Sequence, residues 1–319
     1  MSYHEKTTTA AKGKWRGILL ELGLPADCLT GKHSKCPLCT SKDNFRWDNV
    51  DGRGTFICTC GAGDGMKLAM EFTGEAFSQV APRIDAMLGN VKPDTASPRR
   101  EMSDDDRRRI LRETYAATVP VQPGDLVHAY LSTRRLDQPA YPAALRFGAA
   151  MKDGEGGVRP CMVALVGVHG ETDGKGRQRF CSLHRTFLRP DGRGKAEMAA
   201  PRKLMPGGLP EGACVMLSEW TGGGAIGIAE GIETALAASA RFEMPVWAAI
   251  SSNMMAKWTP PTSAEEVAIF ADNDPKFGGQ AAAFGLAHRL AVKGIPVTVH
   301  VPNIPGTDWA DEWAKEASA

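Results

Sequence analysis

Short apolar segments alternate with segments of helical composition in the last third of the 319-residue chain. Four of the apolar segments are rich in Val and Ile and have the length of buried strands: Ala225–Ala229, 245–250, 267–271 and 296–301. Strands that alternate with helices are typical of a parallel, doubly wound sheet. We therefore predict an α/β fold for this part of the chain.

Acidic residues follow three of these predicted strands: Glu230 after the first, Asp272 and Asp274 after the third, and Asp308 after the fourth. The carboxyl ends of parallel strands share one edge of a sheet, so distant residues can meet there. Asp272 and Asp274 lie two apart and point the same way in extended chain, whereas Asn273 points the opposite way. Carboxylates that lie close together repel unless a cation such as Mg²⁺ is bound between them. Any one of these acids could instead favour a helix start or a turn, but together they predict a divalent-metal site that acts on phosphates.

Two cysteine pairs in the amino-terminal region are separated by eighteen residues, Cys36 and Cys39 in the first pair and Cys58 and Cys60 in the second. The intervening FRWDNVDGRGTFIC predicts a β-hairpin that turns at 51–54. Paired thiolates on two short turns suit tetrahedral Zn²⁺, which is favoured over disulfides in a cytosolic chain. We predict a zinc ribbon. The other cysteines are expected to be small core residues: Cys28, Cys161, Cys181 and Cys214.

The middle of the chain is less regular. Residues 92–100, with prolines at 93 and 98, predict a hinge, and a helix is expected after Ser103 with three Asp in its first turn. Segments 161–168 and 178–188 predict two strands joined by HGETDGKG. We expect a zinc-ribbon template-binding domain at 1–90, a linker at 91–102, a mixed α+β middle domain at 103–215 and a catalytic domain at 216–319.

The runs GIAEGIETALAA, IFADND and GTDWADEW resemble the Toprim domain of phage- and plasmid-encoded DNA primases. This Rossmann-like fold is shared with bacterial replicative primases, type IA and II topoisomerases and some nucleases. The resemblance implies that Glu230 is a general acid/base or a metal-adjacent residue and that Asp272 and Asp274 bind the catalytic metal. Asp308 and Asp311 match a later acidic element, and Glu233 and Thr234 are expected to have a supporting role.

The segment from HSKCPLC through FRW to CTCGAGDG resembles the zinc-binding domain of the same primases. Its second pair is Cys-x-Cys where the related pattern usually has Cys-x2-Cys, so His33 is an alternative fourth ligand to Cys60. Arg46, Trp47 and Arg53 could stack bases and neutralise phosphates of a single-stranded template. Some aromatic residues must instead pack the ribbon, because so small a module has little other core.

The run SLHRTFLRPDGRGKA resembles the primase region upstream of the Toprim domain, which forms the wall of the template and nucleotide cleft. This resemblance makes Arg185, Lys195 and Lys203 candidates for phosphate contact. The charge distribution agrees with such a protein. Residues 216–319 hold six Lys/Arg and twelve Asp/Glu, a net −6, and because the whole chain carries +1, residues 1–215 carry +7. A basic arm joined to an acidic catalytic module suits an enzyme that handles nucleic acid.

Three absences in the sequence narrow the function. The chain has no apolar run of transmembrane length and no signal-peptide core, so we expect a soluble, cytoplasmic protein. No G-x4-GK[ST] phosphate loop occurs, so unwinding is expected to come from a separate replicative helicase.

Together these features predict a DNA primase that makes short RNA primers on single-stranded DNA from ribonucleoside triphosphates, with structural Zn²⁺ and catalytic Mg²⁺ or Mn²⁺. Two alternatives remain. One is a Toprim nuclease that uses the same acids, and the other is a non-catalytic zinc-ribbon module that binds nucleic acid.

Overall fold

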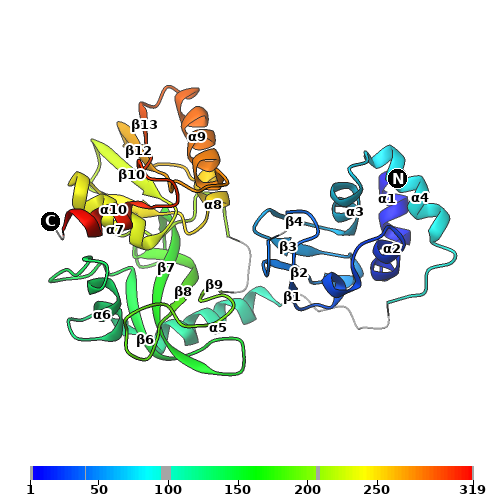
Figure 1. Ribbon diagram of the computed structural model, residues 1–319, viewed down its shortest axis with the longest axis horizontal. Helices are drawn as coiled ribbons and strands as arrows, with labels where there is room; N and C mark the ends of the chain where they lie inside the picture. Colours follow the sequence, from blue (N-terminus) through cyan, green and yellow to red (C-terminus); the bar gives the residue numbers. More distant parts are fainter. Residues whose placement is uncertain (1–2, 40, 95–101, 206–208, 318–319) are drawn as a thin grey trace. The chain divides into compact units, whose positions relative to one another are not determined.

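The computed structural model describes residues 3–39, 41–94, 102–205 and 209–317. Most of the predicted hinge, 95–100, lies outside the described residues. The chain forms two compact units, Met1–Ser103 and Asp104–Ala319 (Figure 1). Within the described residues, no helix is both long enough and apolar enough to cross a membrane.

The amino-terminal unit is a small antiparallel sheet with helices around it. Its strands pair in chain order: β1 His33–Ser34, β2 Phe45–Trp47, β3 Phe56–Cys58 and β4 Gly61–Gly63. Its helices are α1 Tyr3–Ala10, α2 Trp15–Glu21, α3 Gly65–Thr73 and α4 Phe77–Met87, with the 3-10 turns η1 Ala26–Leu29 and η2 Val50–Gly52. Phe45 and Phe56 stack across the hairpin with ring centroids 5.7 Å apart and pack against buried Trp15 and Leu68. The predicted ribbon hairpin is confirmed, with its turn at η2.

The second unit begins with a five-stranded antiparallel sheet. Its strands, in order, are β5 Val119–Pro120, β6 Leu145–Lys152, β7 Val158–Thr172, β8 Gln178–Phe187 and β9 Arg202–Leu204. Helices α5 Asp104–Ala116 and α6 Leu126–Ser132 accompany it. Side chains alternate between the two faces, so Met162 and Ala164 join one buried cluster with α6 while Cys161 and Val163 join another. The predicted pair of strands is confirmed as β7 and β8.

The second sheet of this unit is parallel, as predicted. Its strands lie in the order β11 Val246–Ala248, β10 Ala225–Ala229, β12 Glu266–Phe270 and β13 Val297–His300. Helices α7 Ile232–Phe242 and α10 Trp309–Glu316 pack on one face, and α8 Ser252–Lys257 and α9 Gly278–Ala291 on the other (Figure 1). The strands alternate accordingly: Phe270 lies in the cluster on the α7 side and Ile269 in the cluster on the α9 side.

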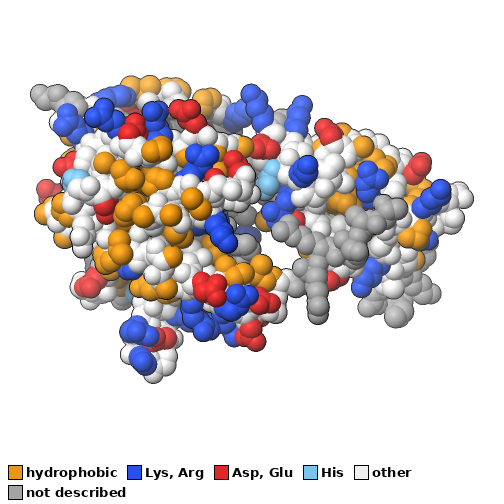
Figure 2. Space-filling view, turned by 90° about the horizontal axis from the view of Figure 1, so that it is seen from below, with side chains coloured by type: hydrophobic (Ala, Val, Ile, Leu, Met, Phe, Trp, Pro, Cys, Tyr) orange, Lys and Arg blue, Asp and Glu red, His pale blue; other side chains and the backbone are white. Residues whose placement is uncertain are grey.

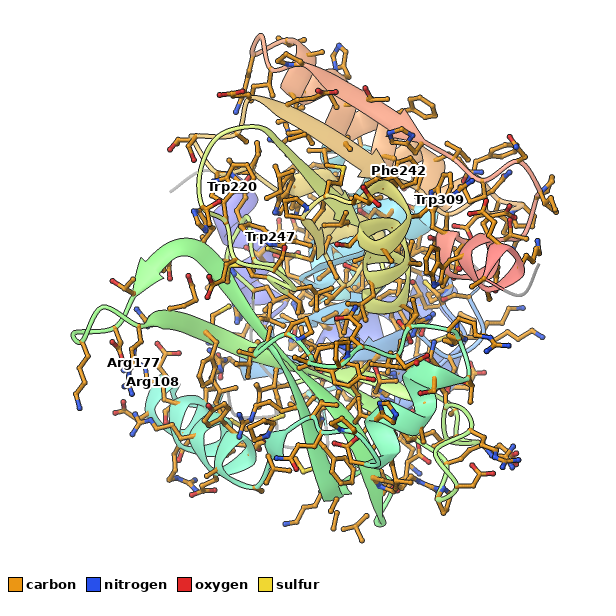
Figure 3. All side chains as sticks on the ribbon, turned by 90° about the vertical axis from the view of Figure 1, so that its left-hand side faces the viewer. Arg108, Arg177, Trp220, Phe242, Trp247 and Trp309 are labelled. Carbon is orange, nitrogen blue, oxygen red and sulfur yellow. The ribbon has the colours of Figure 1, made fainter. Side chains whose placement is uncertain are left out.

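The two sheets of the second unit share one hydrophobic core. Val127 of α6, Met162 of β7 and Ile232 of α7 belong to the same buried cluster. The helix pair α7 and α10 is joined by aromatic contact, because Phe242 lies beside Trp309 with centroids 5.3 Å apart (Figure 3). This shared core holds the start of α7, and with it Glu230, in a defined place relative to the antiparallel sheet.

Candidate metal centres and nucleic-acid interface

Four cysteine sulfurs come together in the amino-terminal unit. The Sγ atoms of Cys36, Cys39, Cys58 and Cys60 all lie within 4.8 Å of one another. The Cys36–Cys60 and Cys39–Cys58 Sγ distances are both 3.8 Å. Tetrahedral zinc with Zn–S bonds of about 2.3 Å places its sulfur ligands about 3.8 Å apart, so this donor set fits Zn²⁺.

The first cysteine turn is shaped by its own backbone. The amides of Leu38 and Cys39 lie 3.4 and 3.5 Å from Cys36 Sγ and donate toward it. Such N–H···S contacts orient thiolate ligands around a metal. The shorter Cys-x-Cys pair delivers both of its sulfurs, whereas His33 is an exposed residue of β1 outside the group. The structure therefore favours Cys60 over His33 as the fourth ligand.

The three residues proposed for template contact in the ribbon differ in their surroundings. Trp47 is only 5% exposed and belongs to the core, so the structure favours the alternative that its ring packs the ribbon. Arg46 pairs with Asp48 at 2.6 Å. Arg53 keeps about half of its side chain exposed (53%), with Asp51 at 3.9 Å. Of the three, Arg53 has the charge most open to a phosphate.

The four predicted acids gather at the carboxyl edge of the parallel sheet. Burial raises the pKa of Asp272 to about 7, and the negative charges of Glu230, Asp308 and Asp274 add to this effect. Burial also raises the pKa of Glu230, and the charge of Asp274 contributes. The acids are close enough to raise one another's pKa. Their oxygens do not all lie within 4.8 Å of one another, whereas the four cysteine sulfurs do; among the described residues, the cysteines are the one group this close.

One oxygen of this group lacks a partner. Asp272 Oδ1 is buried and accepts no hydrogen bond in the described chain. A buried carboxylate oxygen without a donor is costly unless a cation or water satisfies it. Mg²⁺ keeps several waters and is held by one or two carboxylates rather than by a tight protein cage. A wide group of acids with an unsatisfied oxygen therefore fits a hydrated divalent cation.

Hydrogen bonds hold the turn after β12, which contains Asp272, Asn273 and Asp274. The Asn273 amide group donates to Pro302 O at 2.8 Å and accepts from Gln280 at 2.9 Å, so it fastens the turn to the protein interior. Asp274 Oδ2 accepts from the Gly279 amide at 3.0 Å. A Cβ on Gly279 would lie 3.0 Å from Asp272 O, which explains why a glycine suits this close approach.

Asp308 has a structural function in addition to its charge. It is the N-cap of α10, and its Oδ1 accepts from the Asp311 amide at 2.9 Å. Burial raises the pKa of Asp308, and the charge of half-buried Arg134 partly offsets this. Asp311 completes a reciprocal capping box, which gives both acids of this later element a local role.

Glu233, which is expected to have a supporting role, is buried and contacts both Tyr130 and Lys195. The Tyr130 hydroxyl donates to its Oε1 at 2.5 Å, and Lys195 Nζ lies 3.1 Å from the same oxygen. Burial alone would raise the pKa of Glu233, but Lys195 and Tyr130 outweigh it and lower the pKa to about 2. Lys195, a candidate for phosphate contact, is thus engaged with a carboxylate that lies three residues after Glu230.

The other two cleft candidates are also held by the protein. Arg185 donates to Lys152 O at 3.0 Å and lies over the Phe187 ring. Lys203 donates to Asp153 O at 2.8 Å and pairs with Glu155 at 3.2 Å. On the face drawn in Figure 2, Lys and Arg side chains lie interspersed with Asp and Glu side chains.

Arg202 was missed by the sequence analysis. It is exposed on β9, and its positive charge acts on Asp272, Glu230 and Glu233, lowering the pKa of each. Arg202 pairs with Thr186 and Lys203 with Arg185 across β8 and β9, so the two basic neighbours point to opposite faces. The strand register places Arg202 and Lys203 on opposite faces. The electrostatic effect of Arg202 on Asp272 and Glu230 shows that its face is the one near the acids.

Comparisons with known families agree with these two centres. Residues 225–319 match the family model of the Toprim domain. The carboxy-terminal part of the chain is thus similar to a Toprim domain. Residues 31–66 match the zinc-binding domain of primase-helicase, and residues 105–217 match a domain of unknown function, DUF7146. The predicted combination of a Toprim domain with a primase zinc ribbon is confirmed, and it supports the prediction of a DNA primase.

Solved primase structures show remote similarity to the chain. The primase fragment of the bacteriophage T7 primase-helicase protein is 14% identical and has a TM-score of 0.36, covering 89% of this chain and 98% of that one. The DnaG catalytic core is 12% identical and has a TM-score of 0.40, covering 66% of this chain and 74% of that one.

Proposed function

We propose that this protein is a DNA primase that joins ribonucleotides into short primers on a single-stranded DNA template. One observation carries the proposal: the same chain holds a four-cysteine zinc ribbon of the primase-helicase type and a Toprim domain whose acids gather around an unsatisfied aspartate oxygen. Ribonucleoside triphosphates and single-stranded DNA are its proposed substrates, and a separate replicative helicase is its proposed partner.

In this proposal Asp272 and Asp274 hold the divalent cation. Both face the same edge of the sheet, and the hydrogen bonds of Asn273 and Gly279 keep their turn in place. When bound, Mg²⁺ or Mn²⁺ lowers the pKa of the attacking 3′-hydroxyl and offsets charge on the triphosphate. Asp308 adds negative charge from the start of α10, and Arg202 supplies a positive charge for the phosphates at the border of the acidic group.

Glu230 is proposed either to accept the proton of the 3′-hydroxyl or to complete the cation site. Its pKa is raised mainly by burial and then by Asp274. A raised pKa brings a carboxylate closer to the range in which it works as a general base. The buried pairs of Glu233 with Tyr130 and Lys195 hold the start of α7 and so position Glu230.

The zinc ribbon is proposed to engage the template. Zinc held by the four cysteines would join the two turns of the ribbon, and Arg53 offers an exposed positive charge on the hairpin. Phosphate contacts of this kind depend on salt. The domain division at 90, 102 and 215 remains part of the proposal.

The test is ribonucleotide incorporation on single-stranded templates of varied sequence with Mg²⁺, comparing the wild type with Asp272→Ala. We expect the wild type to make short primers and Asp272→Ala to make none while keeping its fold by circular dichroism. Asp105→Ala, which changes an exposed acid of α5, is the matched control and should retain activity. Shortened template strands in the absence of nucleotides would instead indicate a nuclease. Activity that survives Asp272→Ala would refute the catalytic assignment.

A further inference from the structure

We propose that Phe277 and Lys276, in the turn that leads from β12 into α9, form a nucleotide-binding subsite beside Asp274. The Phe277 ring would stack on a nucleobase, and the Lys276 ammonium would pair with a phosphate of the same nucleotide. This inference rests on the proposed function and deepens it, because it names a substrate contact that neither the Toprim signature nor the predicted basic residues include.

The backbone of Phe277 is unusual for an aromatic residue. Its φ of 59° and ψ of 18° lie in the left-handed region, where bulky side chains are rare and glycine is the usual choice. The conformation is held by hydrogen bonds, because the Phe277 amide donates to Asp274 O and its carbonyl accepts from the Ala281 amide, both at 2.9 Å. Glycine would satisfy this turn without strain, so folding alone does not require a phenylalanine here.

The Phe277 side chain gains nothing by burial. The residue is 68% exposed, and it belongs to no hydrophobic cluster of the described chain. The residues on either side of it in the chain, Asp274, Pro275, Lys276 and Gly278, line a hollow of about 410 Å³. Lys276 is exposed, and no carboxylate in the described ranges forms an ion pair with it. An exposed aromatic ring thus lies in the same turn as a hollow whose lining includes an unpaired cation and Asp274, which is proposed to bind the metal.

This combination suits a nucleotide. A ring face accepts any base by stacking, and a lysine neutralises phosphate without regard to sequence. The geometry ties the two to catalysis, since the same turn orients Asp274 through the Gly279 amide. An apolar protein partner would match the ring but not the charged lining of the hollow. The single strand and the incoming ribonucleotide share this chemistry, and binding measurements distinguish them.

Phe277→Gly is the decisive variant, because it removes the ring and relieves the left-handed strain at once. We expect its melting temperature to equal or exceed that of the wild type. At the same time, the Kd for either a fluorescent single-stranded oligonucleotide or ATP, measured with Mg²⁺ by anisotropy and by titration, should rise about 5- to 100-fold. The ligand whose Kd rises identifies the occupant. Phe277→Tyr keeps a ring and should bind as the wild type does.

Phe284→Ala is the matched control, because Phe284 is another exposed phenylalanine, at 56% exposure, and lies within α9. It should change neither Kd. The inference is overturned if Phe277→Gly binds both ligands with wild-type affinity, or if Phe284→Ala weakens binding as much. Since binding is measured without synthesis, either result would leave the Asp272→Ala test of the proposed function standing on its own.

Discussion

The zinc ribbon and the acidic edge of the parallel sheet differ in how closely their candidate metal ligands are grouped. In the ribbon, four sulfurs lie at the spacing that one zinc ion requires, and backbone amides already point at Cys36. At the sheet edge, the acids influence one another but are too widely spaced to form such a closed set, and Asp272 Oδ1 has no partner. Structural metal sites are closed by their protein ligands, whereas catalytic sites keep positions for water and substrate. A catalytic metal site can therefore be recognised by polar atoms that the protein leaves without a partner.

The largest effect is expected when a ligand of the zinc ribbon is removed. In Cys36→Ser we expect loss of zinc and of order in the amino-terminal unit, because structural zinc contributes on the order of 10–16 kcal/mol in small zinc modules. The second unit, Asp104–Ala319, has its own buried clusters and should stay folded. Zinc content by metal analysis and limited proteolysis of the full chain measure the two effects.

Cys181→Ser provides the control for this variant, since Cys181 is half-buried in the second unit, outside the zinc set. It should retain full zinc. Normal priming by zinc-free Cys36→Ser protein would contradict the role given to the ribbon in template engagement.

The next largest effect is expected at the acidic edge of the parallel sheet. Glu230→Gln keeps an oxygen that can contact a cation but cannot accept a proton. We expect the rate of ribonucleotide incorporation to fall about 10²- to 10⁴-fold if the carboxylate is the general base. A titration with Mg²⁺ then separates the two proposed roles: an unchanged half-maximal concentration assigns proton transfer, and a strongly raised one assigns cation binding. An unchanged rate would remove Glu230 from the reaction altogether.

A smaller effect is expected where the Toprim domain is fastened to the antiparallel sheet. Lys195→Ala leaves the Glu233 carboxylate buried without its cation and should cost about 3–5 kcal/mol of unfolding free energy, the range for breaking a buried ion pair. Lys195→Met combined with Glu233→Gln removes both charges and should recover much of that stability. Urea unfolding measures each variant.

Lys203→Ala is the matched control, because Lys203 pairs with Glu155, a more exposed carboxylate (41%). It should cost less than about 1 kcal/mol. If Lys195→Ala costs no more than Lys203→Ala, the pair of Glu233 and Lys195 does not join the two sheets.

A further effect concerns pH. The folded-state pKa of Asp272, about 7, lies above the ordinary value of an aspartate, so the folded protein binds this proton more strongly than the unfolded chain. Stability without added Mg²⁺ should therefore fall as the pH rises from about 4 to 7. Asp272→Asn should weaken this dependence, the remainder coming from Glu230 and Asp308, whose pKa values are also raised. Added Mg²⁺ should restore stability at pH 8. Melting temperatures across this range provide the measurement, and a wild-type profile identical to that of Asp272→Asn would contradict the raised pKa.

Local patterns predicted much of this molecule well. The strand that precedes Glu230 begins and ends at the predicted residues. The spacing of the cysteines predicted the group of four sulfurs. These features depend on periodicity and on short loops, which neighbouring residues control. The sequence allows Trp47 two positions, because an aromatic residue in a small ribbon can pack in the core or lie on a binding face. Only its packing in the structure, with 5% of the residue exposed, distinguishes them.

The sequence by itself determined the parallel sheet, the ribbon and the cysteines and acids that are proposed to bind metal, because strand composition, turn chemistry and ligand type are properties of adjacent residues. Only the tertiary structure decided which charges act together. It paired Lys195 with Glu233, turned Arg202 toward the acids and Lys203 away from them, and left Phe277 exposed beside Asp274. These outcomes depend on sheet register and on packing between distant segments, and the energy of a charge depends on the neighbours that such packing supplies.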